Sequence, residues 1–404
     1  MKKSWSLIKS IVNKHRINSL PDSFCIQGKD SSDQDKIANG FNNYFLSIGK
    51  KLASKIPEVN GDVKSYLGVP NSRTIFLKCT DRPELLSIIN SLKTTSPGWD
   101  DICPYFLKQC LCDQLLKALT HTINQSLQQG VFPNCLKTAQ VIPIYKKGKK
   151  SDIANYRPIS VLSSFSKIFE RIMYNRLINF LDKYKILHEN QFGFRAGRSA
   201  NHALIYLVNK IIKAYENNKF VIGLFLDLSK AFDTVNHSIL LQKLEHYGIR
   251  GHAFNWLSSY LSNRKQLVKF NDSLSEYGVT SCGVPQGSVL GPLLFILYVN
   301  DLMNVSNVFE SILYADDANM FITGDNVDSM IQSINNELQS ITSWLNINKL
   351  SLNVAKTHYL IFSPGRKTPQ PSRSLCMNNK TIAQEQCTTF LGVKLHSKLA
   401  WRYH

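Results

Sequence analysis

Residues 311–322 read SILYADDANMFI, so a pair of aspartates, Asp316 and Asp317, lies between two short apolar runs. Both runs are rich in residues that favour β-strands, and the segment is therefore predicted to be a hairpin with the aspartate pair at its tip. The apolar flanks anchor in the fold and hold the two carboxylates outward at a fixed place.

A third aspartate lies at the end of another apolar segment. Residues 221–228 read VIGLFLDL, which is typical of a strand covered on both faces, and Asp227 lies at its carboxyl end. If this strand pairs beside the hairpin, Asp227, Asp316 and Asp317 converge. Such a cluster raises its own pKa values unless cations neutralise it. Carboxylate oxygens suit Mg²⁺, and two ions can hold an attacking 3′-hydroxyl and a leaving pyrophosphate in line.

Each feature alone has an ordinary structural explanation. An Asp-Asp pair at a hairpin tip is a common solvated turn, and an aspartate after a strand is a common helix cap. The other motifs in the chain decide between the two interpretations.

Six blocks of sequence occur in a fixed order. They are PIYKKG at 143–148 with NYRPIS at 155–160; QFGFR at 191–195 with GRS at 197–199; FLDLSKAFD at 225–233; GVPQGSVLGP at 283–292; YADD at 314–317; and LN at 352–353 with KT at 356–357, followed by FLGV at 390–393. In order and spacing they resemble the reverse transcriptase domain of non-LTR, LINE-type retrotransposons, closest to the jockey-like group. Residues 41–99 also resemble the family's amino-terminal extension.

The resemblance implies an α+β right-hand polymerase fold with fingers and palm. Residues 1–72 are expected to form a helical N-terminal extension, 73–220 a fingers-type region with basic nucleotide- and template-binding motifs, and 221–404 a palm, with about 130–395 forming the reverse transcriptase domain. The thumb is expected to be largely absent, because the chain stops soon after the 390–393 block. The protein is therefore expected to be a truncated element.

The resemblance also assigns the reaction centre. Asp227 and Asp316, with the backbone carbonyl of Leu228, would hold two Mg²⁺ ions, with Mn²⁺ as an alternative, and Asp317 would be a supporting third carboxylate. Phe232 would lie under the sugar of the incoming nucleotide, where its ring would clash with a 2′-hydroxyl and reject ribonucleotides. The alternative for Phe232 is an ordinary core phenylalanine.

Four further residues match nucleotide-binding positions of the family. Arg157 would grip the triphosphate in bidentate fashion, and a lysine of the 146–150 cluster, here Lys146, would add a point charge. Gln286 offers a donor and an acceptor from one amide. Lys356 would lie near the leaving pyrophosphate as a proton donor. For most of the lysine cluster a solvated basic turn explains the sequence equally well.

Template and primer contacts are implied for two other segments. Gln191, Arg195 and Arg198 would lie along the template strand, where basic groups contact phosphates without reading sequence. Phe390, Leu391 and Gly392 resemble the hairpin that grips the primer terminus, although a buried β-turn has the same pattern.

Composition agrees with a polyanionic partner. Lys and Arg number 48 against 29 Asp and Glu, a formal charge of +19 that favours binding to nucleic acid phosphates. Nine cysteines, an odd number, do not indicate a secreted disulfide framework. Charged residues interrupt the N-terminal segment, and no apolar run approaches the roughly 20 residues of a membrane span. An intracellular protein of nucleus or cytoplasm, without membrane contact, is expected.

The predicted activity is RNA-directed DNA polymerisation, a nucleotidyltransferase reaction that adds dNTPs to the 3′-hydroxyl of a DNA primer on an RNA template. Two alternatives stay open. One is RNA-templated RNA synthesis or intron maturation, which preference for rNTPs over dNTPs would indicate. The other is a non-catalytic nucleic-acid-binding remnant that keeps the fold but cannot extend a primer.

Local patterns predict several elements outside these motifs. Helices are expected at 33–56, 81–92, 113–129, 166–184 and 327–345 from apolar spacing and terminal cap residues, and a connecting loop at 60–73.

Overall fold

β5 (Phe220–Asp227) is the central strand of a five-stranded sheet with the order β14-β11-β5-β10-β9. The computed structural model describes residues 21–400 apart from 22, 27, 58, 60 and 366–368. The antiparallel neighbours of β5 are β10 (Asp317–Gly324) and β11 (His358–Phe362); β9 (Glu310–Tyr314) and β14 (Ala383–Gln384) form the edges. The predicted apolar strand, the predicted hairpin and their pairing are confirmed.

The register of this sheet brings the aspartates to one end. Asp317, the first residue of β10, is paired with Asp227 on one side and with Tyr314 on the other. Only Ala315 and Asp316 remain to turn the chain between β9 and β10, and Ala315 takes a left-handed φ of 57°. The tight turn therefore places Asp316 at the very tip of the hairpin.

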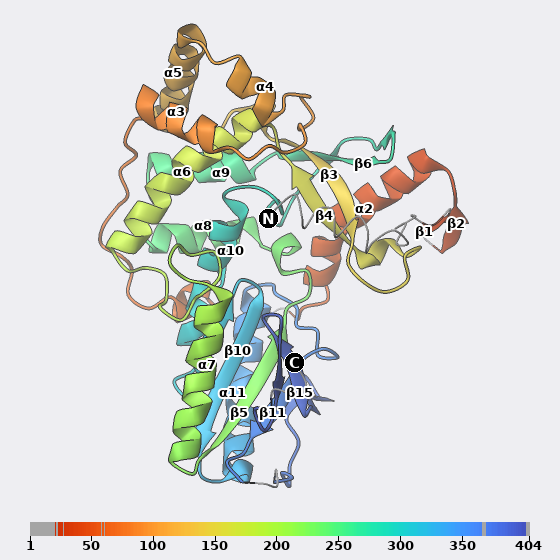
Figure 1. The fold of residues 1–404 in the computed structure, drawn as a ribbon, viewed down its shortest axis with the longest axis vertical. Helices are drawn as coiled ribbons and strands as arrows, with labels where there is room; N and C mark the ends of the chain where they lie inside the picture. Colours follow the sequence, from red (N-terminus) through yellow and green to blue (C-terminus); the bar gives the residue numbers. More distant parts are fainter. Residues whose placement is uncertain are drawn as a thin grey trace, which may run out of the picture.

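Side chains alternate across β5 and bury both faces of the sheet. Ile222 and Leu224 belong to the core that includes α11 (Val327–Ile347), whereas Val221 and Phe225 belong to the core under α7 (Ala200–Glu216). The hairpin of β15 (Cys387–Phe390) and β16 (Val393–His396) packs into the α7 core. Figure 1 shows the sheet in the lower half of the molecule with α7 along it.

A second sheet lies in the other half of the molecule (Figure 1). It has the order β4-β3-β6-β7, formed by β3 (Thr138–Tyr145), β4 (Tyr156–Val161), β6 (Lys265–Phe270) and β7 (Ser273–Leu274), and β8 (Gly278–Val279) also pairs with β6. Its strands come from both the 73–220 and the 221–404 ranges. Those range boundaries stay a prediction, and the sheet shows that the ranges interleave in space.

The predicted N-terminal helix, α2 (Gln34–Ala53), packs on this second sheet. The Asp33 side chain caps it by accepting from the backbone N–H groups of Asp35 and Lys36. Phe41 on its buried face contacts Tyr156 of β4, with the ring centroids 5.0 Å apart. The short strands β1 (Phe24–Ile26) and β2 (Lys29–Ser31) precede α2 in the chain and pair with each other.

The remaining helices pack around the two sheets and make the fold α+β. The predicted helix ends are confirmed closely, and Gly130 ends α5 with a left-handed φ of 66°. The helices are α3 (Arg82–Ser91), α4 (Pro104–Gln109), α5 (Asp113–Gln129), α6 (Ser164–Lys183), α8 (His237–His246), α9 (His252–Leu261) and α10 (Gly291–Tyr298).

Short elements complete the described chain. The 3₁₀ turns are η1 (Val63–Tyr66), which lies in the predicted 60–73 loop, η2 (Asn134–Leu136), η3 (Ile153–Asn155), η4 (Ala231–Asp233) and η5 (Asn300–Asn304). A two-stranded pair is formed by β12 (Cys376–Met377) and β13 (Lys380–Thr381). Among the residues that the structure describes, no helix combines the length and apolarity that a membrane crossing requires.

Candidate active site

A cavity of about 560 Å³ opens where the end of β5 meets the β3–β4 connection, η4 and the loop before α10. Its walls come from segments more than 200 residues apart in the chain. The predicted site residues that line it are Lys146, Arg157, Asp227, Leu228, Phe232, Gln286, Asp316 and Lys356. The fold therefore gathers most of the predicted reaction centre and nucleotide-binding set around one space.

The three aspartates lie close enough to influence one another. Asp317 keeps contact with solvent, but desolvation raises the pKa of its carboxyl to about 6, and the neighbouring Asp316 and Asp227 carboxylates add to the rise. Lys356 faces the same cluster, with its Nζ 3.6 Å from Asp227 Oδ2. The backbone carbonyl of Asp227 accepts from the N–H of Asn353, which ties the end of β5 to the segment carrying Lys356.

The donor set fits a hard divalent cation that takes part of its coordination from elsewhere. Within the described ranges, no three His, Cys, Asp or Glu side chains are grouped so as to hold a metal ion by themselves. Asp227, Asp316 and the Leu228 carbonyl nevertheless offer the oxygen ligands that Mg²⁺ prefers, and a cation would relieve the repulsion that raises the pKa of Asp317. Waters and substrate phosphates are the usual remaining ligands of Mg²⁺.

Cationic side chains also line this cavity. Lys146 and Arg157 lie on the β3–β4 hairpin and line the cavity. Desolvation lowers the pKa of the Lys146 amine, and the neighbouring Arg157 and Lys356 cations lower it further. Lys230 holds the β3–β4 connection in place, because its Nζ donates to the carbonyls of Ala154 and Tyr156 at 3.2 and 3.3 Å.

The sequence pattern assigns no role to Lys230, although the residue lies in the FLDLSKAFD block. Its left-handed backbone, with φ of 50°, directs the chain into η4 immediately after the strand that carries Asp227. Nothing in the local sequence indicates that its amine reaches a strand more than 70 residues earlier, since that contact depends on how the two sheets pack.

Phe232 lies between the core and the cavity. One face of its ring stacks on Phe295 with centroids 4.4 Å apart, and Phe194 meets it edge-on at 6.2 Å. The residue is half-buried and lines the cavity. Contacts with two other rings hold the Phe232 ring in a fixed position at the cavity.

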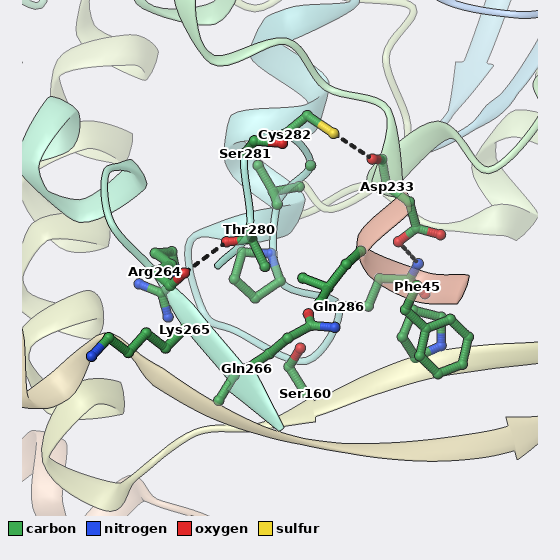
Figure 2. Close-up of a pocket in the computed structure, with 16 residues that line it drawn as sticks. Phe45, Ser160, Asp233, Arg264, Lys265, Gln266, Thr280, Ser281, Cys282 and Gln286 are labelled. Atoms are coloured by element: carbon green, nitrogen blue, oxygen red, sulfur yellow. Dashed lines mark hydrogen bonds between the residues drawn. The ribbon is translucent and has the colours of Figure 1, made fainter. Parts of the chain in front are cut away.

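Gln286 is held from two sides. Its backbone carbonyl accepts from the N–H of Ser160 at 2.7 Å, and its side-chain Nε2 donates to Asp233 Oδ1 at 2.7 Å. Asp233 was not among the predicted site residues, although it directly follows Phe232. Figure 2 shows this hydrogen bond at the edge of a second, smaller cavity of about 50 Å³.

The predicted template residues lie outside the cavity. Gln191 is only 1% exposed, and its Oε1 accepts from the N–H of Gly193, so its side chain supports the turn beside the β9–β10 hairpin. Arg195 Nη1 donates to the carbonyl of His188, and the Arg198 guanidinium lies over the Phe192 ring at 5.2 Å. Their template role stays a prediction, and burial leaves Gln191 the least accessible of the three.

The predicted primer-contacting segment is a hairpin turn. Leu391 and Gly392 connect β15 to β16 with left-handed φ values of 49° and 86°. Phe390 is 2% exposed, and its ring packs edge-on against Phe225 of β5 at 6.1 Å. The turn therefore rests on the strand that carries Asp227, but it does not line the cavity.

Carboxylates, cations and an aromatic ring thus line one cavity on an α+β fold, a combination that suits nucleotidyl transfer. The family model for reverse transcriptase (RNA-dependent DNA polymerase) matches residues 144–395. The chain belongs to the reverse transcriptase family, and the predicted resemblance is confirmed.

The relatives found among curated proteins are similar to most of this chain. A probable RNA-directed DNA polymerase from transposon X-element of Drosophila melanogaster is 33% identical over 322 residues, covering 78% of this chain and 35% of the relative. A probable RNA-directed DNA polymerase from transposon BS of Drosophila melanogaster is 29% identical over 396 residues, covering 94% of this chain and 43% of the relative. The RNA-directed DNA polymerase from mobile element jockey of the same organism is 31% identical over 350 residues, covering 85% of this chain and 38% of the relative. The chain thus spans less than half of each of these relatives.

Proposed function

We propose that this chain is an RNA-directed DNA polymerase of a non-LTR retrotransposon, which adds dNTPs to the 3′-hydroxyl of a DNA primer on an RNA template. One observation carries the proposal: Asp227 and Asp316 line the same cavity as Arg157 and Lys146. That arrangement suits a substrate with a polyanionic tail whose reacting phosphate must meet a metal-binding carboxylate pair.

The incoming nucleotide would occupy the cavity with its triphosphate between the two walls. Arg157 and Lys146 would neutralise the phosphates, and Lys230 would keep their strands in place through its bonds to the carbonyls of Ala154 and Tyr156. The sugar would lie over Phe232, because this ring lines the cavity together with the carboxylates and is held by stacking on Phe295.

Asp227, Asp316 and the Leu228 carbonyl would hold the catalytic metal ions, and Asp317 would support them as a third carboxylate. When bound, two Mg²⁺ ions, or Mn²⁺, supply the positive charge that stabilises the attacking and leaving oxygens. The protein's own contribution is to fix the carboxylates on paired strands, so that the site needs little reorganisation when substrate binds.

Lys356 would donate a proton to the leaving pyrophosphate. Two observations support this role: its Nζ lies 3.6 Å from Asp227 Oδ2, and the residue lines the same cavity as Arg157 and Lys146. The Lys356 ammonium group would give a proton to a phosphate oxygen as the bond to the α-phosphate breaks.

The two sheets would correspond to two parts of a right-hand polymerase. The sheet around β5 would be the palm, and the sheet of β3, β4 and β6 with its helices would form the fingers. Arg195 and Arg198 would contact the template backbone, and the turn at Leu391 and Gly392 would contact the primer end.

The proposal is tested by primer extension that varies template and sugar. A DNA primer annealed to RNA or DNA templates is incubated with the chain, Mg²⁺ and either dNTPs or rNTPs. We expect incorporation of dNTPs on the RNA template. Preference for rNTPs would support the RNA polymerase alternative. If the primer binds but is not extended, by the chain alone or by the chain joined to the segment that follows in the X-element relative, the protein is a binding remnant.

A further inference from the structure

We infer that Tyr44 of α2 is a positioning residue for triphosphate binding, because its ring holds the Lys230 ammonium group beside the strand that carries Arg157. The inference rests on the proposed function. It gives a role in nucleotide binding to a helix that lies outside the matched residues 144–395 and to which neither the sequence motifs nor the comparisons assign one.

Lys230 joins the end of β5 to the β3–β4 connection. Its Nζ donates to the carbonyls of Ala154 and Tyr156 at 3.2 and 3.3 Å, and Arg157 directly follows Tyr156 in β4. Lys230 and Arg157 both line the cavity of about 560 Å³ that the nucleotide would occupy. The position of the Lys230 amine therefore affects where the Arg157 guanidinium lies relative to the triphosphate.

The Tyr44 ring is a further partner of the Lys230 amine. Lys230 Nζ lies over this ring, 5.6 Å from its centroid, within the roughly 6 Å at which the face of an aromatic ring attracts a cation. An ammonium group has three N–H donors, of which the carbonyls of Ala154 and Tyr156 accept two. The ring thus stabilises the charged amine in addition to these hydrogen bonds.

The charges around Lys230 explain why an aromatic partner suits this place. Desolvation lowers the pKa of the Lys230 amine, the Asp233 carboxylate opposes this change, and three neighbouring cations lower the pKa further: Lys146, Arg157 and Lys356. A ring face favours the charged form of the amine without carrying a negative charge that would repel a triphosphate. The cavity therefore keeps its positive charge.

α2 also contacts the structure on both sides of the Lys230 hydrogen bonds. Phe41, one turn before Tyr44, packs on the Tyr156 ring with the centroids 5.0 Å apart. A Cβ added to Gly49 would lie 2.5 Å from a backbone oxygen of η4, so the helix packs directly on the segment that follows Lys230. Figure 1 shows α2 next to β3 and β4. The helix thus supports Tyr44 from two fixed contacts.

The alternative role for Tyr44 is packing alone. Phe41 and Phe45 are buried members of the core between α2 and the second sheet, whereas Tyr44 is only partly buried and packs at the border of that core. Core packing depends on the apolar volume of a side chain, but attraction of a cation depends on its aromatic face. Variants that change one property and keep the other therefore separate the two roles.

The test is a double-mutant cycle in the full chain. Tyr44→Leu removes the aromatic face, Tyr44→Phe retains it, and Lys230→Met removes the ammonium group. Single-nucleotide extension on an RNA template gives kcat and KM for dTTP, and inhibition by pyrophosphate probes phosphate binding without a base or sugar. Tyr105→Leu, at an exposed tyrosine on α4, is the matched control.

Binding is measured separately from turnover. A primer that ends in a dideoxynucleotide cannot be extended, so the affinity of each variant for dTTP can be titrated on this primer and its template. The affinity for the template–primer itself is measured in the same variants, because a nucleic-acid contact of Tyr44 would change that affinity instead. Melting temperatures report whether each variant is folded.

We expect Tyr44→Leu to raise KM for dTTP and the inhibition constant of pyrophosphate about fivefold, with less than about a twofold change in kcat. Tyr44→Phe and Tyr105→Leu should keep the parent's values. In the Lys230→Met background, Tyr44→Leu should raise neither constant further. The affinity for the template–primer should stay that of the parent.

Three outcomes would overturn the inference: parent values of KM in Tyr44→Leu, equal losses in Tyr44→Leu and Tyr44→Phe, or the same loss in the Lys230→Met background. Weaker binding of the template–primer with unchanged dTTP affinity would also overturn it. A parent chain that binds dTTP but does not incorporate it would count against the proposed function, and the dTTP affinities of the variants would still decide the role of Tyr44.

Discussion

Lys356 Nζ lies 3.6 Å from Asp227 Oδ2, so a lysine near the C-terminal end of the matched region faces the carboxylate that ends the central strand. Their side chains are 47% and 41% exposed, and ion pairs this exposed contribute at most about 1 kcal/mol to stability. The proposed role of Lys356 as a proton donor therefore explains this contact better than its small contribution to the stability of the fold.

Replacement of Lys356 should separate activity from stability. We expect Lys356→Met to lower kcat for dNTP incorporation by about 10²-fold, because a positioned proton donor is lost. The free energy of unfolding, measured with urea, should change by less than about 1 kcal/mol. Lys380→Met, on exposed β13, is the control and should leave both quantities unchanged. A Lys356→Met variant with the parent's kcat would refute the proton-donor role.

Removal of the aromatic wall should relax sugar selection. Phe232→Ala opens space beside Phe295 where a 2′-hydroxyl would otherwise clash, so we expect the ratio of kcat/KM for dNTP over rNTP to fall by at least about tenfold. Single-nucleotide incorporation assays measure this ratio. Phe106→Ala, an exposed phenylalanine on α4, should keep the parent's selectivity. An unchanged ratio in Phe232→Ala would leave Phe232 as an ordinary packing residue.

The carboxyl of Asp233 should make stability depend on pH. Desolvation raises its pKa from the ordinary aspartate value of 3.8 to about 6 in the folded chain, so the folded state binds the proton more tightly than the unfolded state. Its stabilising contribution is complete below about pH 4 and is lost as pH rises through 6. We therefore expect Asp233→Asn to gain stability relative to the parent between pH 4 and pH 7.

Thermal melting of the two proteins across that pH range measures this difference. The gap between their melting temperatures should widen as pH rises and level off above about pH 7. A gap that stays constant from pH 4 to pH 8 would show that Asp233 has an ordinary pKa in the folded chain. Asp272→Asn, a change at an exposed aspartate in the β6–β7 turn, should follow the parent at every pH.

A buried ion pair should be costly to break. Lys243 is 0% exposed, and its Nζ donates to Asp301 Oδ1 at 2.5 Å and to the Tyr298 carbonyl at 2.6 Å. Lys243→Met would leave the Asp301 carboxylate buried without its cation, so we expect a loss of about 3–5 kcal/mol in urea unfolding. The double variant with Asp301→Leu should recover part of that loss. A loss below 1 kcal/mol in the single variant would contradict this account.

Much of the fold follows from local sequence. The helix at 113–129 could be placed to the residue, because its apolar spacing ends at Gly130, which alone tolerates the left-handed cap without strain. The hairpin of β9 and β10 could also be placed, since two apolar runs flank the aspartate pair, although Asp317 already belongs to β10 and the turn consists of Ala315 and Asp316. The convergence of Asp227 with Asp316 and Asp317 could be predicted because Asp227 ends a strand that is apolar on both faces.

The parts that could not be predicted depend on long-range packing. The parallel pairing of β6 with β3 joins segments more than 120 residues apart, and no local period encodes it. The bond between Asp233 and Gln286 spans 53 residues, and each residue alone looks like an ordinary polar side chain in a motif. Burial of Gln191 likewise depends on how closely its loop approaches the hairpin.

We propose that nucleotidyl transfer requires the Asp316 carboxylate at the hairpin tip. The two ends of β10 are flanked by two aspartates that serve as a matched pair for testing this requirement. Asp316 directly precedes β10 at the cavity, whereas Asp325 directly follows the other end of that strand and is 79% exposed beside Lys219. We would measure primer extension on an RNA template with Asp316→Asn and Asp325→Asn. We expect Asp316→Asn to abolish dNTP incorporation and Asp325→Asn to retain it. Incorporation at the parent's rate by Asp316→Asn would contradict the account.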